Sequence, residues 1–286
     1  MKHFFYYLVI ILPLLFSCSD DNDVVPIEND DTTFMMEVAL KGHVYHVKST
    51  YDKNGNLVYL DDSFLSVYKN EILKNDSIIT YDAGEKSLAY YTSVDEMMDS
   101  LGLRFIDVEP YVLLPSEAEM KTRTVPSDAR AGRVSLFQHL DYGGQVLELS
   151  AQYTKFMTIP KMSEPDDSGI DWNDKASSII VYSNIPLNDS VYVNPSDVNY
   201  QYISVPYAST ATTGSQKYAT NDLRVVFLGY QHKDYGGDVM CIVPNNNSYK
   251  CHHRLNDINW NDKMSSCTLR LAVNNLYSDS PSNAYN

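Results

Sequence analysis

Two segments in the second half of the chain repeat each other, and this repeat constrains the fold more than any other feature. The segment FQHLDYGG at 137–144 matches YQHKDYGG at 230–237, and WNDKASS at 172–178 matches WNDKMSS at 260–266. Both tryptophans of the protein lie in these segments. Each copy also contains short alternating apolar runs, which are typical of strands. The pattern predicts a duplicated antiparallel β unit, because a pair of copies can bury an apolar face that one copy leaves exposed.

The repeated segments have the form of a known motif. In each copy an aromatic residue is followed five positions later by a second aromatic and then by two glycines, and an Asn-Asp-x-x-Ser-Ser segment comes later. Both elements occur twice, in the same order. This combination resembles the Greek-key motif of the βγ-crystallin superfamily. The resemblance implies a Greek-key β-sandwich over residues 132–275, with motifs at 132–183 and 223–273 and an insertion at 184–222.

The residues of the motif suit a folded hairpin. The paired glycines after Tyr142 and Tyr235 allow the chain to turn with positive φ, where a Cβ would clash. The two aromatics of each copy would pack on that hairpin as a local corner. The resemblance also implies that the first serine of each Ser-Ser pair, Ser177 or Ser265, hydrogen-bonds the folded hairpin.

In microbial members of that superfamily the Asn-Asp-x-x-Ser-Ser segment is also a calcium loop, so the resemblance implies two Ca²⁺ sites. Each site would combine the Asn-Asp pair of one copy with the first serine of the other, and the lysines would supply backbone carbonyls only. Oxygen ligands of these kinds are those that calcium prefers. The candidate ligands are Asn173, Asp174, Lys175, Ser177 and Gln138 in the first copy and Asn261, Asp262, Lys263, Ser265 and Gln231 in the second.

Two features distinguish this chain from the calcium-binding pattern. Gln138 and Gln231 stand where many calcium-binding members have Glu, which removes one charge from each site. Residues 184–222 also separate motifs that normally follow one another closely. We therefore expect weak sites, with a Kd of about 10⁻⁴ M or poorer. The alternative, in which these segments only satisfy turn and backbone hydrogen bonds, stays open.

The N-terminus has the features of an export signal. Lys2 precedes a thirteen-residue apolar stretch that ends shortly before Cys18, and this pattern predicts a signal peptide over 1–17 with lipidation of Cys18. The acidic residues that follow resemble the surface-export signal of Bacteroidetes-type lipoproteins, and residues 18–33 would form a tether. We expect a lipid-anchored protein of the outer membrane, exposed at the cell surface. An ordinary cleaved signal peptide is the alternative.

Residues 34–115 predict a small α+β module that precedes the sandwich, so the fold class is mainly β. The Asn54-Gly55 pair is typical of a hairpin turn. Apolar residues over 64–72 recur at helical spacing, and Ser93 begins a capping box. Residues 116–131 lack apolar periodicity and are expected to form a linker.

Charge and motif content exclude some functions. The net charge of −15, from 22 Lys and Arg against 37 Asp and Glu, is unsuited to nucleic-acid binding. The sequence contains none of the common catalytic motifs, so we expect a protein that is not an enzyme. His43 and His46 are three apart in an extended stretch and should point to opposite faces. The group formed by Cys251, His252, His253 and Asp257 could hold a metal, but a disulfide or a solvated loop is favoured there.

Two further roles stay open. Some bacterial secreted inhibitors of metalloproteases share this Greek-key fold, so protease inhibition is the alternative function. One disulfide among Cys241, Cys251 and Cys267 is expected in an oxidising compartment, and a pair from the 241–267 region could staple an inhibitory loop. The insertion at 188–222 is rich in Tyr, Ser, Thr and Asn. That composition suits contact with a protein or glycan partner, and equally a β-ribbon made of 191–193 and 200–205.

Overall fold

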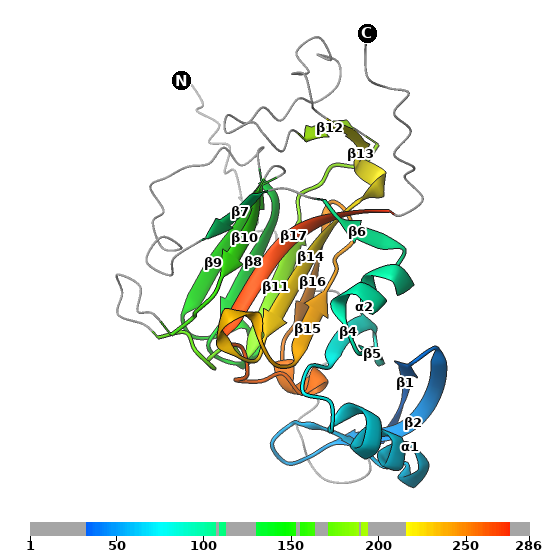
Figure 1. Ribbon diagram of the computed structural model, residues 1–286. Coiled ribbons are helices and arrows are strands. Elements are labelled where there is room, and N and C mark those ends of the chain that lie inside the picture. The colour runs from blue at the N-terminus through cyan, green and yellow to red at the C-terminus, as the bar shows by residue number, and fades with distance from the viewer. Residues whose placement is uncertain are drawn as a thin grey trace, which may run out of the picture. The chain divides into compact units, whose positions relative to one another are not determined.

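Strands dominate the part of the chain that the structure describes. The structure is a computed structural model, and it describes residues 33–106, 109–112, 130–152, 155–163, 171–188, 190–193 and 216–274. Its two large sheets contain eleven and four strands (Figure 1), so the prediction of a mainly β protein is confirmed. The signal peptide, Cys18 and most of the linker and of the insertion lie outside the described residues.

Each copy of the repeat supplies four strands, and the third strand of each copy joins the sheet of the other. β10 pairs antiparallel with β17, and β16 pairs antiparallel with β11. This exchange joins two Greek keys into one sandwich, which confirms the predicted fold of the C-terminal region. The strands of the first copy are β8 (Arg130–Phe137), β9 (Val146–Gln152), β10 (Lys155–Ile159) and β11 (Ser178–Ser183). Those of the second copy are β14 (Leu223–Tyr230), β15 (Val239–Ile242), β16 (Ser248–His252) and β17 (Ser266–Asn274).

Alternating side chains of these strands divide between two cores. On β14, Val225 and Phe227 face the four-stranded sheet and belong to the large core of the sandwich. Val226 and Leu228 face the opposite way and belong to a second apolar cluster, together with Met97 of helix α2 (Val94–Ser100). Because successive residues of a strand point to opposite faces, the central strands of this sheet are apolar on both sides.

Between residues 33 and 106 the N-terminal module contains six strands and three short helical segments, and two local features predicted from its sequence are present. β2 and β3 form the hairpin expected at Asn54-Gly55. Ser93 accepts a hydrogen bond from the backbone N–H of Glu96 at 3.1 Å, and so caps α2. The strands are β1 (Phe34–Leu40), β2 (His43–Tyr51), β3 (Leu57–Tyr59), β4 (Ile79–Gly84), β5 (Ser87–Tyr91) and β6 (Leu103–Phe105). The helical segments are α1 (Asp62–Val67), η1 (Tyr68–Ile72) and α2 (Val94–Ser100).

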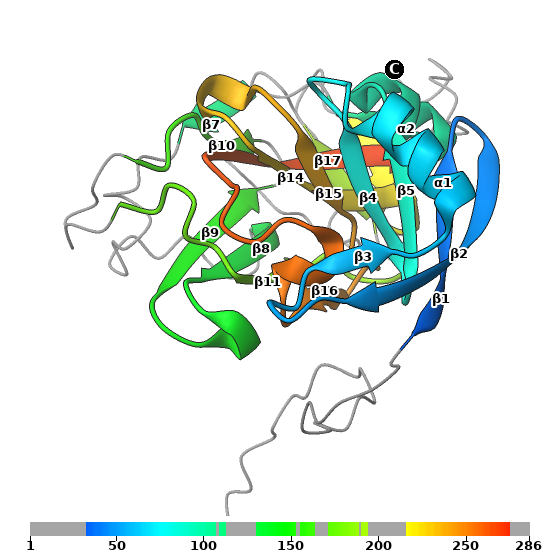
Figure 2. The same cartoon turned by 90° about the horizontal axis from the view of Figure 1, so that it is seen from below.

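The module and the sandwich share one sheet. β4 pairs parallel with β15, the edge strand of the Greek-key part of that sheet. β6 pairs with β17, and β7 (Glu109–Val112) pairs with β10. Figure 2 shows β4 and β5 continuing the sheet of β14, β15 and β17. The boundary predicted at 116–131 stays a prediction, but strand pairing joins the regions on either side of it.

The insertion contributes one ribbon to the described residues. β12 (Ser190–Val193) pairs with β13 (Gln216–Ala219), so the ribbon expected from 191–193 has its partner at 216–219, while 200–205 lies outside the described residues. Four single turns of helix complete the description: η3 (Leu140–Tyr142), η5 (Thr220–Asp222), η6 (Lys233–Tyr235) and η7 (Leu255–Ile258). None of the described helices is both long and apolar enough to cross a membrane.

Candidate metal centre

The hairpin of each copy folds into the same corner. The ring centroids of Phe137 and Tyr142 lie 5.3 Å apart at 60°, and those of Tyr230 and Tyr235 lie 5.4 Å apart at 71°. Edge-to-face geometry of this kind is favourable for aromatic pairs. The aromatics of the motif therefore pack on the hairpin as predicted.

The second serine of the Ser-Ser pair spans the folded hairpin in both copies. The bond expected from the first serine is also present in the first copy, where Ser177 Oγ donates to the carbonyl of Gln138, whereas Ser265 Oγ contacts Asp174. Ser178 Oγ accepts the N–H of Tyr142 at 3.1 Å and donates to the carbonyl of His139 at 2.7 Å. Ser266 Oγ makes the same two hydrogen bonds, at 3.1 and 2.6 Å. The second serine begins a strand and is fully buried, so its hydroxyl satisfies hairpin groups that water cannot reach.

The glycines of the hairpin act differently from one another. Gly143 keeps a φ of −86°, whereas Gly144 has a φ of +78°. A Cβ at Gly144 would lie 2.7 Å from Cδ2 of His139, and a Cβ at Gly237 would lie 2.7 Å from Cδ2 of His232. Thus only the second glycine of each pair needs its conformational freedom. The two histidines pack over these glycines.

The two predicted calcium loops, residues 171–177 (the first loop) and 259–265 (the second loop), lie against each other. The backbone N–H of Asp174 donates to the carbonyl of Met264 at 3.0 Å, and the N–H of Asp262 donates to the carbonyl of Ala176 at 3.1 Å. Both aspartates have a positive φ, 53° and 51°, a conformation that Asp tolerates better than most residues. The insertion at 184–222 therefore does not separate the loops in space.

Each first serine contacts the aspartate of the other copy. Ser177 Oγ lies 3.1 Å from Oδ1 of Asp262 and donates to the carbonyl of Gln138 at 2.8 Å. Ser265 Oγ lies 3.0 Å from Oδ1 of Asp174. We call the first group, with Asn261, the Asp262 cluster, and the second, with Asn173, the Asp174 cluster. The reciprocal pairing that the resemblance implies is present at both.

The asparagine beside each aspartate leaves one buried oxygen without a partner. Asn173 Nδ2 donates to Oδ2 of Asp174 at 2.6 Å, and Asn261 Nδ2 donates to Oδ2 of Asp262 at 2.7 Å. The Oδ1 atoms of both asparagines are buried and accept no hydrogen bond. A buried polar atom without a partner costs free energy. Each cluster therefore holds an amide oxygen that a hard cation would satisfy.

These groups match the oxygen ligands of calcium better than those of transition metals. Each cluster presents a carboxylate, a hydroxyl and an amide oxygen, and the Asp262 cluster adds the carbonyl of Gln138. Among the described residues, no three His, Cys, Asp or Glu side chains come together as a metal group. Calcium takes six to eight oxygens in flexible geometry, so a bound ion would retain several waters. Each cluster supplies one carboxylate, and the strength of calcium binding stays a prediction.

The remaining predicted ligands are Gln231, Lys175 and Lys263. Gln231 occupies in the second hairpin the position of Gln138, and its backbone N–H donates to the carbonyl of Asp238 at 2.9 Å. Lys175 and Lys263 are exposed within the two loops. Burial of part of the Lys263 side chain lowers the pKa of its amine, and the negative charge of Asp238 opposes that effect. Whether the two lysine carbonyls bind a cation stays a prediction.

No disulfide joins Cys241, Cys251 and Cys267 to one another, which corrects the prediction: Cys251 is disulfide-bonded, but Cys241 and Cys267 are free, buried thiols. β15 and β17 flank β14 on opposite sides, which separates these two cysteines by two strand spacings, about 9.5 Å. A disulfide requires Cα atoms within about 7 Å. The thiols also face different cores. Burial raises the pKa of Cys267 to about 12 and that of Cys241 further.

The histidines beside Cys251 diverge. His253 packs on the ring of Tyr142, with centroids 4.6 Å apart. His252 Nε2 lies 3.1 Å from Oδ2 of Asp82. The metal group considered for this segment is therefore not assembled. His43 and His46, in contrast, are exposed on the regular strand β2, where their spacing places them on opposite faces as predicted.

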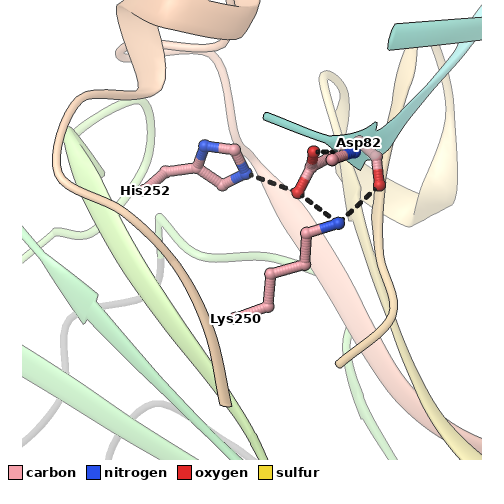
Figure 3. Close-up of polar contacts among 4 residues, drawn as sticks. Asp82, Lys250 and His252 are labelled. Atoms are coloured by element: carbon pink, nitrogen blue, oxygen red, sulfur yellow. Dashed lines mark hydrogen bonds and ion pairs between the residues drawn. The ribbon is translucent and has the colours of Figure 1, made fainter. Parts of the chain in front are cut away.

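Asp82 is a polar residue that the sequence did not single out. It lies on β4, is 3% exposed, and reaches across the sandwich to Lys250 and His252 of β16 (Figure 3). Lys250 Nζ lies 2.7 Å from Oδ2 of Asp82 and donates to its backbone carbonyl at 2.7 Å. Burial by itself raises the pKa of Asp82, but His252 and Lys250 outweigh it and hold the pKa below 3.8. No local pattern in the sequence marks this contact, because the partners are about 170 residues apart.

Comparisons with known proteins add little to this geometry. No family of known proteins and no curated protein matches the chain. A solved chain described as "Evolution of the eye lens beta-gamma-crystallin domain fold" is similar to it, with 15% identity over 51% of this chain and 88% of that one, at a TM-score of 0.25. At that TM-score the likeness carries no weight of its own. The architecture rests on the exchange of β10 and β16 between the two sheets.

Proposed function

We propose that this protein is a non-enzymatic calcium-binding protein whose two Greek keys hold one Ca²⁺ in each of the Asp262 and Asp174 clusters. The observation that carries the proposal is the reciprocal contact of Ser177 with Asp262 and of Ser265 with Asp174. A turn that only closed its own hydrogen bonds would not need a partner loop. A cation shared by the two loops would tie the copies together, so the expected role is structural or adhesive.

The buried amide oxygens favour this function over a purely structural turn. The Oδ1 atoms of Asn173 and Asn261 are buried without a hydrogen-bond partner. Each asparagine also donates to the carboxylate of the neighbouring aspartate in its loop. Bound calcium would supply the missing interaction and strengthen the fold. In that state the carboxylate and hydroxyl would turn toward the ion instead of toward each other.

Calorimetric titration of residues 19–286 with Ca²⁺ tests the proposal. We expect binding with a Kd of about 10⁻⁴ M or poorer, together with a rise in melting temperature. The double variant Asp174→Ala/Asp262→Ala should lose both effects. A matched variant, Asp76→Ala/Asp99→Ala, removes the same charge from exposed positions of the module and should bind as the wild type does. Absence of heat and of stabilisation at millimolar calcium would overturn the metal function.

The cellular setting that we propose is the outer membrane, with a lipid on Cys18 as the anchor and the sandwich exposed at the cell surface. The support for this setting is the N-terminal sequence alone. Cys18 itself lies outside the residues that the structure describes. Palmitate labelling of the full chain, with Cys18→Ala as the unlabelled control, tests the anchor. A labelled Cys18→Ala chain would contradict this assignment.

Inhibition of a metalloprotease is the alternative role on the same fold. The free thiols of Cys241 and Cys267 remove the disulfide that was expected to staple a loop near them. A panel of metalloproteases tests the alternative directly. A protein or glycan partner for 188–222 is likewise a proposal from composition.

A further inference from the structure

The polypeptide that leads into the second loop is fastened to the N-terminal module. Asn256 of η7 is 6% exposed and its Nδ2 donates to the carbonyl of Asn54, in the β2–β3 turn, at 2.8 Å. β3 lies against η7. Upstream on β16, Lys250 and His252 hold Asp82 of β4 (Figure 3). Two separate parts of the module, the β2–β3 turn and β4, therefore form hydrogen bonds or ion pairs with the segment 250–256.

From this segment the connection to the Asp262 cluster is short. Leu255, the first residue of η7, accepts the N–H of Trp260 at 2.7 Å and donates its own N–H to the carbonyl of Ser177 at 2.9 Å. Ser177 is the hydroxyl ligand of the Asp262 cluster, and Asp262 follows Trp260 by two residues. A displacement of η7 would therefore move both the carboxylate and the hydroxyl of that cluster.

The first loop is held by different neighbours. Trp172 donates its backbone N–H to the carbonyl of Met162, and Met162 donates to the carbonyl of Ser265, both at 2.9 Å. Asp174 donates to Met264. These bonds run within the Greek-key sandwich, and the serine of the Asp174 cluster is fixed by its own N–H, which donates to the carbonyl of Tyr230 at 2.9 Å.

We propose that docking of the N-terminal module controls calcium binding at one site of the pair: it holds η7 and thereby raises the affinity of the Asp262 cluster, with little effect on the Asp174 cluster. The proposal rests on the calcium function argued above. Because coupling between two equilibria is reciprocal, calcium at the Asp262 cluster also strengthens the contacts of Asn54 and Asp82 with the segment 250–256. The module then acts as a regulatory element that makes two similar sites unequal.

Titration of single-cluster proteins separates the two sites. Asp174→Ala leaves the Asp262 cluster, and Asp262→Ala leaves the Asp174 cluster. Adding Asn256→Ala should weaken calcium binding about tenfold in the first background, the effect of about one lost hydrogen bond, and less than about twofold in the second. Equal weakening at both clusters, or none at the Asp262 cluster, would overturn the proposal.

Asn246 supplies a matched control for Asn256. Its Nδ2 also donates to a backbone carbonyl, that of Thr220, at 2.6 Å, and its Oδ1 is also buried without a partner. Asn246→Ala therefore removes the same groups, but its hydrogen bond is to Thr220 and not to the N-terminal module. It should change neither calcium affinity by more than about twofold.

Hydrogen exchange of the calcium-free protein tests the coupling without any metal, so a failure of the calcium function is distinguishable from a failure of this inference. Asn256→Ala, and independently Asp82→Asn, should speed exchange of the Trp260 and Asp262 amides about tenfold more than that of the Asp174 amide. Glu148→Gln, which removes a carboxylate bonded to Ser135, is the control for Asp82→Asn. Equal acceleration of exchange in both loops would show that the module does not stabilise the second loop preferentially, and it would overturn the proposal.

Discussion

The two copies of the repeat have the same internal geometry but different surroundings. In both, the second serine bonds a tyrosine N–H at 3.1 Å, and in both the second glycine lies beneath a histidine. The N-terminal module pairs with both copies, through β4 on β15 of the second and β7 on β10 of the first, but the buried contact of Asp82 is made to β16 of the second copy. The difference teaches that the repeated residues determine the corner, whereas the environment of each corner is decided by segments outside the repeat.

The comparison also shows that neither copy forms a candidate site by itself. Asp174 needs Ser265 and Asp262 needs Ser177, so each cluster is completed across the junction of the copies. Duplication of the unit is thus a requirement of the site as well as of the core. The predictions below test where the likeness between the copies ends.

The largest loss of stability should come from Asp82→Asn. This substitution affects the second copy alone, because Asp82 contacts Lys250 and His252 of β16. The substitution leaves the ammonium of Lys250 without its buried counter-charge. Loss of one partner of a buried pair costs about 3–5 kcal/mol, and because Lys250 is 25% exposed we expect about 2–3 kcal/mol. Urea denaturation at neutral pH measures this loss.

The pH dependence of Asp82→Asn identifies the cause. The pKa of Asp82 in the folded protein lies below 3.8, so its carboxylate stabilises the fold fully above that pH. This stabilisation is lost as the pH falls through the folded pKa. The wild type and the variant should therefore converge in stability as the pH falls below the folded pKa of Asp82. Glu148→Gln should cost less than about 1 kcal/mol, and a pH-independent gap for Asp82→Asn would rule out the ionic explanation.

A smaller effect, and one that should be the same in both copies, is expected from Ser178→Ala and Ser266→Ala. Each removes a buried hydroxyl and leaves a tyrosine N–H and a histidine carbonyl without a partner. An unsatisfied buried group costs about 1–3 kcal/mol, and we expect about 2 kcal/mol for each variant. Chemical denaturation of the two variants side by side gives the comparison. A difference above about 1 kcal/mol would mean that the module or the insertion alters the corner.

The features that the sequence predicts well are those that local physics determines. Gly-Gly after a tyrosine, Asn-Gly between apolar runs, and Ser93 before Met97 each specify a turn or a helix start within a few residues. The repeat extended this to two Greek keys and to the pairing of Asp174 with Ser265. The resemblance predicts a hairpin contact for the first serine, and in the first copy both serines make one, Ser177 with the carbonyl of Gln138 and Ser178 with that of His139.

The features that the sequence does not predict depend on distant segments. The parallel pairing of β4 with β15 joins residues about 160 apart and has no signature in either strand. No pattern in the sequence marks Asp82, yet it is buried against Lys250 and His252 of another sheet. The free cysteines follow from strand order, because β14 separates Cys241 from Cys267. Such contacts are set by which edges meet after the strands have formed.

The smallest effect, and the sharpest test of equivalence, is expected from Gly144→Ala and Gly237→Ala. Their φ angles are +78° and +75°, where an L-residue costs about 1–2 kcal/mol. A Cβ would also come within 2.7 Å of the histidine ring in each copy, but His139 and His232 are exposed and can rotate away. We expect about 1 kcal/mol for each, with equal values in the two copies.

Gly236→Ala provides the internal standard for these glycines. Its φ is −100°, and the nearest atom to a new Cβ would be 3.5 Å away, so it should change the free energy of unfolding by less than about 0.5 kcal/mol. Adding His139→Ala to Gly144→Ala separates the two sources of cost. If the double variant recovers the loss, the ring contact dominates; if it does not, the backbone conformation does. Because the same pair of substitutions is available at His232 and Gly237, any difference between the copies would come from what surrounds the hairpin and not from the motif itself.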